Sequence, residues 1–270
     1  MRRRGPGEEL ARLIVSLGDP ALRRDFLVER LMTGDPTEAR LRADTAKGLS
    51  RMAAQLDELA LAAEQGEEAA KEALVAVVDA MNDPRASEAL QLLREDAAGA
   101  GLVALDRLLR RPIHVQPRRG PRSQNPPDYG YGRPLTLGER KSLAKRPDRN
   151  LLERLLADPH PDVIRSVLRN ARLVEDDVVR FVARHPGRPE LLTEVARFPK
   201  WVHRPRVRLA LVLNPLSPIE VAIPLAGLLL RHELRLVVES TNVPLPVRAA
   251  ALEHLQRKYP HDEETERLVQ

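Results

Sequence analysis

Apolar residues in the first 111 positions recur every three or four residues, which is the period of an amphipathic helix. Asp-Pro pairs beginning at Asp19, Asp35 and Asp83 each place a side-chain acceptor before a proline suited to a first helical turn, so they predict helix starts. Two heptads of apolar residues follow the second pair, over residues 49–59. So short a run favours packing within one domain, with a coiled-coil dimer as the alternative. We therefore predict an N-terminal helical domain over residues 1–111 with five or six helices.

The next segment, residues 112–134, shows no periodicity. The stretch from Arg111 to Pro134 contains six prolines and three glycines. Proline fixes φ and lacks a backbone donor, so such a segment forms neither helix nor sheet. We predict an extended, semi-rigid linker.

Helical periodicity resumes at Thr136, where Thr136-Leu-Gly-Glu139 has the spacing of a capping box. An irregular internal repeat follows. Helical stripes end at Asn170, His185, Asn214 and Ser240, at intervals of 15, 29 and 26 residues, and a short turn that usually bears proline leads to the next stripe. Because asparagine tolerates the left-handed conformation, we expect Asn170 and Asn214 to be helix C-caps. Residues 135–270 are thus predicted to be a C-terminal helical-repeat domain.

Two segments in this half carry a family resemblance. Asp158-Pro-His-Pro-Asp-Val-Ile-Arg-Ser-Val-Leu and Pro244-Leu-Pro-Val-Arg-Ala-Ala-Ala-Leu-Glu-His-Leu are similar to the second helix of a HEAT repeat. Residues 135–258 as a whole resemble HEAT-like and leucine-rich-repeat-variant proteins. The resemblance implies an α-solenoid with a protein-binding surface and no reaction. Short helices with one apolar face must also stack on their neighbours to bury it, which favours the same architecture.

Composition excludes several classes of protein. Apolar residues make up 43% of the 270 and charged residues 31%, a balance that supports a folded core. Cysteine is absent, which excludes disulfides, thiolate nucleophiles and cysteine-bound zinc. It also excludes the cysteine-bound iron–sulfur module of some leucine-rich-repeat-variant proteins. The longest apolar run, residues 221–230, is too short to span a membrane and contains Pro224. We expect a cytoplasmic protein with no membrane span.

Catalytic chemistry has no support in the sequence. None of the seven histidines falls in a zinc-binding pair, and no glycine-rich phosphate loop or nucleophile elbow occurs. Asp176 and Asp177 could do acid–base work, but with Glu175 they stand where a helix should begin, and acids there stabilise the helix dipole. We expect no enzymatic activity, no catalytic residue, no cofactor and no metal.

The positive charge is concentrated around the linker. The net charge is +5, and five arginines occur with no acid among them: Arg110, Arg111, Arg118, Arg119 and Arg122. Three interpretations stand: a linker kept soluble by charge, a docking segment for an acidic protein surface, and a strand that binds nucleic acid or anionic lipid. Aromatic residues are 3% of the chain, which argues against base stacking.

A second basic cluster surrounds the only tryptophan. Its members are Lys200, Trp201, Arg204, Arg206 and Arg208. Tryptophan and arginine are common anchors of binding hot spots, so these residues are candidate partner-binding anchors. The alternative is that Trp201 fills the gap between neighbouring repeats while the arginines are solvated.

Together these features predict an all-α protein, with an N-terminal helical bundle joined by a Pro-rich linker to a C-terminal HEAT-like α-solenoid. The leading functional hypothesis is a non-enzymatic adaptor or scaffold that holds a protein partner. The alternative is a nucleic-acid-binding protein that uses residues 110–149 and the cluster around Trp201. Affinity that falls steeply with salt would indicate phosphate contacts.

Overall fold

The structure is a computed structural model that describes residues 5–33, 45–110, 125–184 and 188–258. These residues form sixteen α-helices and no strand. The prediction of an all-α chain is therefore confirmed for the part described. Among these residues, no helix is both long enough and apolar enough to cross a membrane.

Six helices make up the N-terminal half, as the periodicity predicted. They are α1 (Pro6–Ser16), α2 (Pro20–Thr33), α3 (Thr45–Glu64), α4 (Glu68–Met81), α5 (Ser87–Ala100) and α6 (Val103–Leu109), with a 3-10 turn, η2 (Pro84–Ala86), before α5. Helices α1, α3 and α4 contact one another and supply much of the core.

Helix starts in this half follow the sequence signals. The Asp19 carboxylate accepts hydrogen bonds from the backbone N–H groups of Ala21 and Leu22, at 2.7 and 3.2 Å. The Asp83 carboxylate accepts one from Arg85 N–H at 3.0 Å, at the start of η2. Both aspartates cap their helices as predicted, whereas Asp35 lies outside the described residues.

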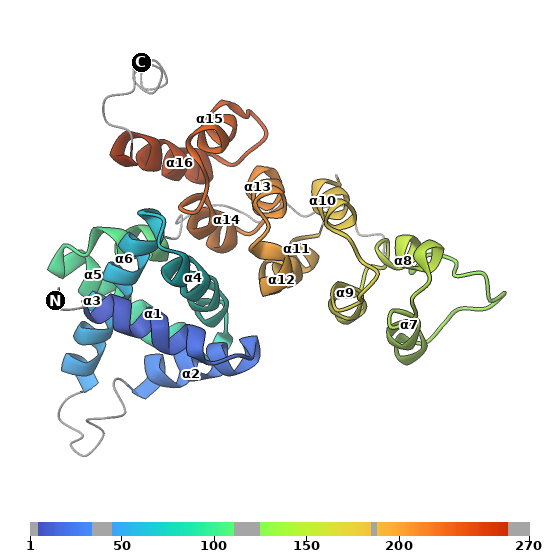
Figure 1. The fold of residues 1–270 in the computed structure, drawn as a ribbon, viewed down its shortest axis with the longest axis horizontal. Helices are drawn as coiled ribbons and strands as arrows, with labels where there is room; N and C mark the ends of the chain where they lie inside the picture. The colour runs from blue at the N-terminus through green and yellow to red at the C-terminus, as the bar shows by residue number, and fades with distance from the viewer. Residues whose placement is uncertain (1–4, 34–44, 111–124, 185–187, 259–270) are drawn as a thin grey trace.

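Ten helices make up the C-terminal half. They are α7 (Leu137–Leu143), α8 (Arg149–Leu155), α9 (Pro161–Leu168), α10 (Glu175–Ala183), α11 (Pro189–Ala196), α12 (Pro199–Val202), α13 (Pro205–Leu213), α14 (Ile219–Ala226), α15 (Arg231–Glu239) and α16 (Leu245–Lys258). Figure 1 shows two rows, with α7, α9, α11–α12 and α14 below and α8, α10, α13 and α15 above, and α16 packs against α14 and α15. Along the lower row α9 contacts α7 and α11, and along the upper row α13 contacts α10 and α15.

Helix α14 lies between the two halves. Every residue of the helix except Glu220 is buried, including Pro224, and the helix contacts α4 and α6 of the N-terminal half as well as α13 and α16. A helix covered on most sides needs apolar residues nearly all round. The first part of the longest apolar run, residues 221–226, therefore lies in the helix that joins the N-terminal half to the rows.

The segment before α7 belongs to the C-terminal half. Tyr129 is 7% exposed, and its hydroxyl donates a hydrogen bond to the buried carboxylate of Asp158. Arg140 of α7 holds the same carboxylate at 2.6 Å. Tyr129, which falls within the predicted linker 112–134, therefore packs onto the helices of the C-terminal half. Most of the remainder of this linker lies outside the described residues.

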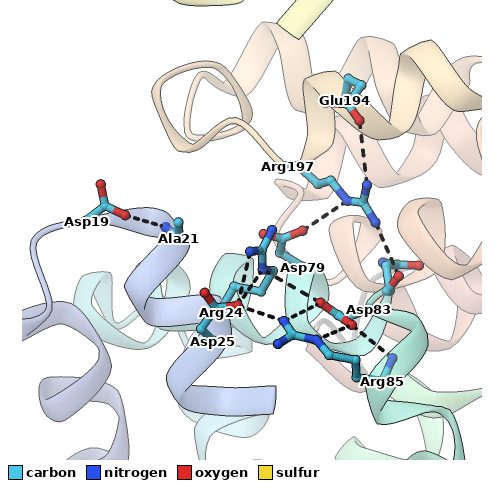
Figure 2. A network of polar contacts seen from close by, with 10 residues as sticks. Asp19, Ala21, Arg24, Asp25, Asp79, Asp83, Arg85, Glu194 and Arg197 are labelled. Carbon is cyan, nitrogen blue, oxygen red and sulfur yellow. Dashed lines mark hydrogen bonds and ion pairs between the residues drawn. The ribbon is translucent and has the colours of Figure 1, made fainter. Parts of the chain in front are cut away.

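Ion pairs also join the two halves. Arg197, which follows α11, reaches Asp79 of α4 at 3.1 Å and donates to the Asn82 carbonyl at 3.2 Å (Figure 2). A second set of ion pairs involves α6. Arg107 of α6 pairs with Glu64 of α3 at 2.9 Å and with Glu253 of α16 at 3.5 Å. The halves therefore form one packed body in the described residues.

Candidate functional site: the basic rim

The turns that lead from the lower row to the upper row lie along one edge of the C-terminal half. They connect α7 to α8, α9 to α10, α12 to α13 and α14 to α15. We call this edge the basic rim and define it by its bases: Lys145, Arg146, Arg169, Arg172, Lys200, Arg204, Arg231 and His232. Apart from Arg231, which is half-buried, these side chains are exposed.

Side-chain donors hold the first three turns side by side. The buried amide of Asn170, in the second turn, donates to the carbonyls of Ala144 and Arg146 in the first turn, at 2.7 and 2.9 Å. The indole N–H of Trp201, beside the third turn, donates to the Leu168 carbonyl before the second turn, at 2.8 Å. Each bond satisfies a carbonyl that a helix end would leave unpaired.

Charged side chains connect the starts of the upper-row helices. Arg149 at the start of α8 forms two hydrogen bonds with Asp177 of α10, at 2.5 and 2.6 Å. Asp176, which precedes Asp177 in α10, pairs with Arg206 of α13 at 2.6 Å. Burial lowers the pKa of Arg208 of α13, and the negative charges of Glu233 of α15 and of Glu68 act to raise it. The charges therefore alternate across four successive helices.

Asp177 is the most buried carboxylate of this series. It is 4% exposed and accepts hydrogen bonds from Arg149, from Arg180 and from the Val174 backbone N–H. Burial acts to raise the pKa of Asp177, but the hydrogen bonds from Arg149 and the backbone outweigh it and hold this pKa below its usual value. Asp177 is therefore a charged structural group that caps α10, as the sequence favoured.

Two large apolar side chains are exposed at helix N-caps on this edge. Val174 precedes α10 and is 47% exposed, and Leu230 precedes α15 and is 56% exposed. Valine and leucine are poor N-caps because they offer no acceptor. An acid three residues on, Asp177 or Glu233, instead accepts a hydrogen bond from the backbone N–H of the N-cap residue. The rim thus presents apolar groups between its bases.

The predicted anchors around Trp201 occupy different environments. Trp201 is 2% exposed, so it fills the space between neighbouring helices and offers no surface to a partner; Lys200 lies over its ring at 4.2 Å. Arg208 is 9% exposed, and burial lowers its pKa. Arg204 and Arg206 are both exposed, and Arg206 pairs with Asp176.

The linker arginines are for the most part not placed. Arg111, Arg118, Arg119 and Arg122 lie outside the described residues. Arg110 pairs with Glu253 of α16 at 2.6 Å, so it helps to join the two halves.

The prediction that Asn170 and Asn214 adopt the left-handed conformation is wrong. Every described residue with positive φ is a glycine, and Asn214 has φ −77° and ψ 119°. Its amide instead donates to the Val182 carbonyl of α10 at 2.5 Å. Both asparagines therefore act through their side-chain amides, which donate hydrogen bonds to carbonyls of neighbouring helices and turns.

Sequence reasoning missed Val174 and Leu230. The available signal was a large apolar residue at an expected N-cap, three residues before an acid. The described part of the chain also contains no group of three or more His, Asp or Glu side chains arranged to hold a metal ion.

Comparisons with known proteins identify no family: no family model, no curated protein and no solved structure matches the chain.

Proposed function

We propose that this protein is a non-enzymatic protein-interaction scaffold, in which residues 135–258 form a HEAT-like α-solenoid whose basic rim binds a protein partner. The observation that supports this proposal is the set of contacts repeated from unit to unit along the rim. Asn170 and Trp201 fix successive turns, and Arg149–Asp177 and Asp176–Arg206 fix successive helix starts. Surfaces held in this way lose little conformational entropy when a partner binds.

The N-terminal half has a structural role in this proposal. An array of stacked helices leaves an apolar face open at each end, and a terminal unit has to cover it. Helices α4 and α6 cover α14 in this way. The N-terminal bundle then acts as a large cap on one end of the solenoid.

The exposed bases of the rim support a second candidate, binding to nucleic-acid phosphates. Phosphate binding would make affinity fall steeply with salt. Single-strand binders also use aromatic platforms for base stacking, and Trp201 is buried and donates its N–H to protein. The apolar groups at Val174 and Leu230 have no use in a phosphate track. Protein binding is therefore the function that the rim supports best.

Site-specific photo-crosslinking in the native cell tests the proposal. A photoreactive residue replaces the exposed Arg169 on the rim in the full chain, and a matched variant carries it at the exposed Glu88 of α5. We expect discrete adducts at position 169 that protease removes and nuclease does not, and none of these at position 88. Adducts removed by nuclease would establish the second candidate. Absence of any adduct specific to position 169 would contradict both.

A further inference from the structure

We infer that the basic rim binds an extended acidic protein segment that carries two apolar side chains, one at Val174 and one at Leu230, with acids between them facing Arg204. This inference rests on the proposed function and specifies the chemistry of the partner. It follows from the order of exposed groups along the rim.

The order is apolar, basic, apolar at three successive upper-row helices. The N-cap residues of α10, α13 and α15 are Val174, Arg204 and Leu230, and all three are exposed. Arg172 flanks Val174, and His232 flanks Leu230. A ligand that satisfies this order needs negative charge in its centre and apolar groups on both sides.

The apolar residues are costly in an uncovered protein. Ser, Thr, Asp or Asn at an N-cap stabilises a helix by about 1 kcal/mol relative to an apolar residue. At both sites the chain has an apolar side chain, and an acid from the helix itself serves the backbone N–H. Val174 is 47% exposed and Leu230 is 56% exposed, so about half of each side chain remains uncovered. A partner that covers them supplies the missing gain.

The separation of the two apolar groups sets the form of the segment. Packed helices lie about 8–10 Å apart, so the starts of α10 and α15, with α13 between them, lie about 16–20 Å apart. An extended chain advances about 3.3 Å per residue and its side chains alternate between two faces, so two apolar side chains that both face the rim lie about six residues apart. The acids between them then lie opposite Arg204.

Charge complementarity identifies the partner as acidic. Two of the three acids in the first turn of α10 are occupied, because Asp177 holds Arg149 and Asp176 holds Arg206. Exposed Arg172 and Arg204 stand outside these pairs, toward solvent. Carboxylates of a protein segment form strong paired hydrogen bonds with guanidinium groups, and apolar neighbours exclude water from them.

Selection from a displayed library of random peptides of about 12 residues, long enough to span both apolar sites, tests the inference on the immobilised full chain. We expect the selected peptides to be enriched in Asp and Glu flanked by apolar residues about six positions apart. The pair Val174→Ser and Leu230→Ser should weaken their binding roughly tenfold, and so should the pair Arg172→Glu and Arg204→Glu. Serine is the better N-cap, so the first pair keeps or raises stability and its loss of binding is not a loss of fold.

Matched controls lie away from the rim. Leu92→Ser removes a side chain that is 47% exposed on α5, and Arg184→Glu reverses an exposed arginine at the opposite end of α10. Both should change affinity by less than about twofold. Peptides without acids, or peptides unaffected by both rim variants, would overturn the inference while leaving protein binding in place. A DNA duplex of about 20 base pairs that binds the rim more tightly than every selected peptide would overturn the inference and favour the nucleic-acid candidate.

Discussion

Single side chains connect successive turns of this protein, and they do so with neutral donors. The Asn170 amide serves two carbonyls of the preceding turn and accepts from Arg172 N–H at 2.9 Å, so most of its hydrogen-bonding capacity is used. Trp201 donates one such bond to the Leu168 carbonyl of α9, and Asn214 donates one to the Val182 carbonyl of α10. A buried carbonyl without a partner is costly, so each of these residues fixes the position of the neighbouring turn.

Asn170→Ala should lower the free energy of unfolding by about 1–3 kcal/mol, because it leaves the buried carbonyl of Ala144 and the partly buried carbonyl of Arg146 without their donor. Urea denaturation followed by circular dichroism measures the change. Asn150→Ala is the matched control, since Asn150 is exposed on α8 and its loss should cost less than about 0.5 kcal/mol. Equal losses in the two variants would contradict the role assigned to Asn170.

The single tryptophan allows burial to be measured without substitution. Because Trp201 is 2% exposed, its fluorescence in the native protein should lie at shorter wavelength than that of free tryptophan and resist quenching by acrylamide. Unfolding in urea should remove both properties together. Strong quenching in the native state would mean that Trp201 faces solvent. Trp201→Ala is a poor test of binding, because a truncated buried tryptophan costs about 3–5 kcal/mol.

At the scale of the element, helix starts carry much of the organisation. Asp177 serves its own helix through the Val174 backbone and the preceding helix through Arg149, so one carboxylate fixes both a start and a helix pair. Its neighbour Asp176 has a surface pair with Arg206, in which both side chains are more than 60% exposed. Two adjacent acids therefore have unequal energetic roles.

Asp177→Asn should destabilise the protein at pH 7 by about 2 kcal/mol, because hydrogen bonds to charged groups are worth about 1.5–3 kcal/mol. The pKa of Asp177 is lowered in the folded state, so the stability it contributes is present above the ordinary value of 3.8 and is lost as pH falls toward the folded value. The difference between wild type and variant should therefore shrink in acid. Denaturation curves from pH 7 to pH 3 measure it. Asp176→Asn should cost less than about 0.5 kcal/mol, and a larger cost than that of Asp177→Asn would reverse the assignment.

Local signals were sufficient to predict helix starts, but not the side-chain hydrogen bonds that connect one turn to the next. Asp19, Asp83 and Thr136 cap as predicted because capping involves residues two or three apart. Asn170 acts on carbonyls 24 and 26 residues away, and no local pattern encodes that distance. The exposed N-caps Val174 and Leu230 become meaningful only when three helix starts are seen side by side.

At the scale of the whole molecule, the two halves form one body through α14 and a set of ion pairs. From the sequence alone, the apolar run of residues 221–230 showed only that it is too short to span a membrane. In the structure, residues 221–226 of this run lie in the helix between the two halves, where a helix needs apolar side chains on nearly all sides. Two aspartates near the contact between the halves, Asp79 and Asp83, have pKa values shifted in opposite directions. Asp79 faces Arg197 across this contact, and Asp83 lies in a cluster with Arg85 and Arg24 on the N-terminal side (Figure 2).

Asp79→Asn should stabilise the protein at pH 8, even though it removes a partner of Arg197. Burial raises the pKa of Asp79 to about 6, against the opposing attraction of Arg197 and Arg24. A folded pKa above the ordinary 3.8 means that this group favours folding fully below pH 3.8 and loses that contribution as pH rises through 6. At pH 8 the charged form costs about 3 kcal/mol, which asparagine avoids while keeping the shape of the side chain. The advantage of the variant should fade between pH 6 and pH 4.

Asp83→Asn gives the opposite sign and serves as the control. The side-chain hydrogen bond from Arg85 lowers the pKa of Asp83 to about 2, so its charge favours folding at pH 8 and the variant should be less stable there. Both variants are compared with wild type by urea denaturation at pH 8 and pH 5. If Asp79→Asn lost stability at pH 8 as Asp83→Asn does, the pair with Arg197 would outweigh the cost of burial. The contact between the halves would then depend on that ion pair as well as on the apolar faces of α14. A gain in stability would assign the contact to α14, with Asp79 as a charge that the contact tolerates at neutral pH.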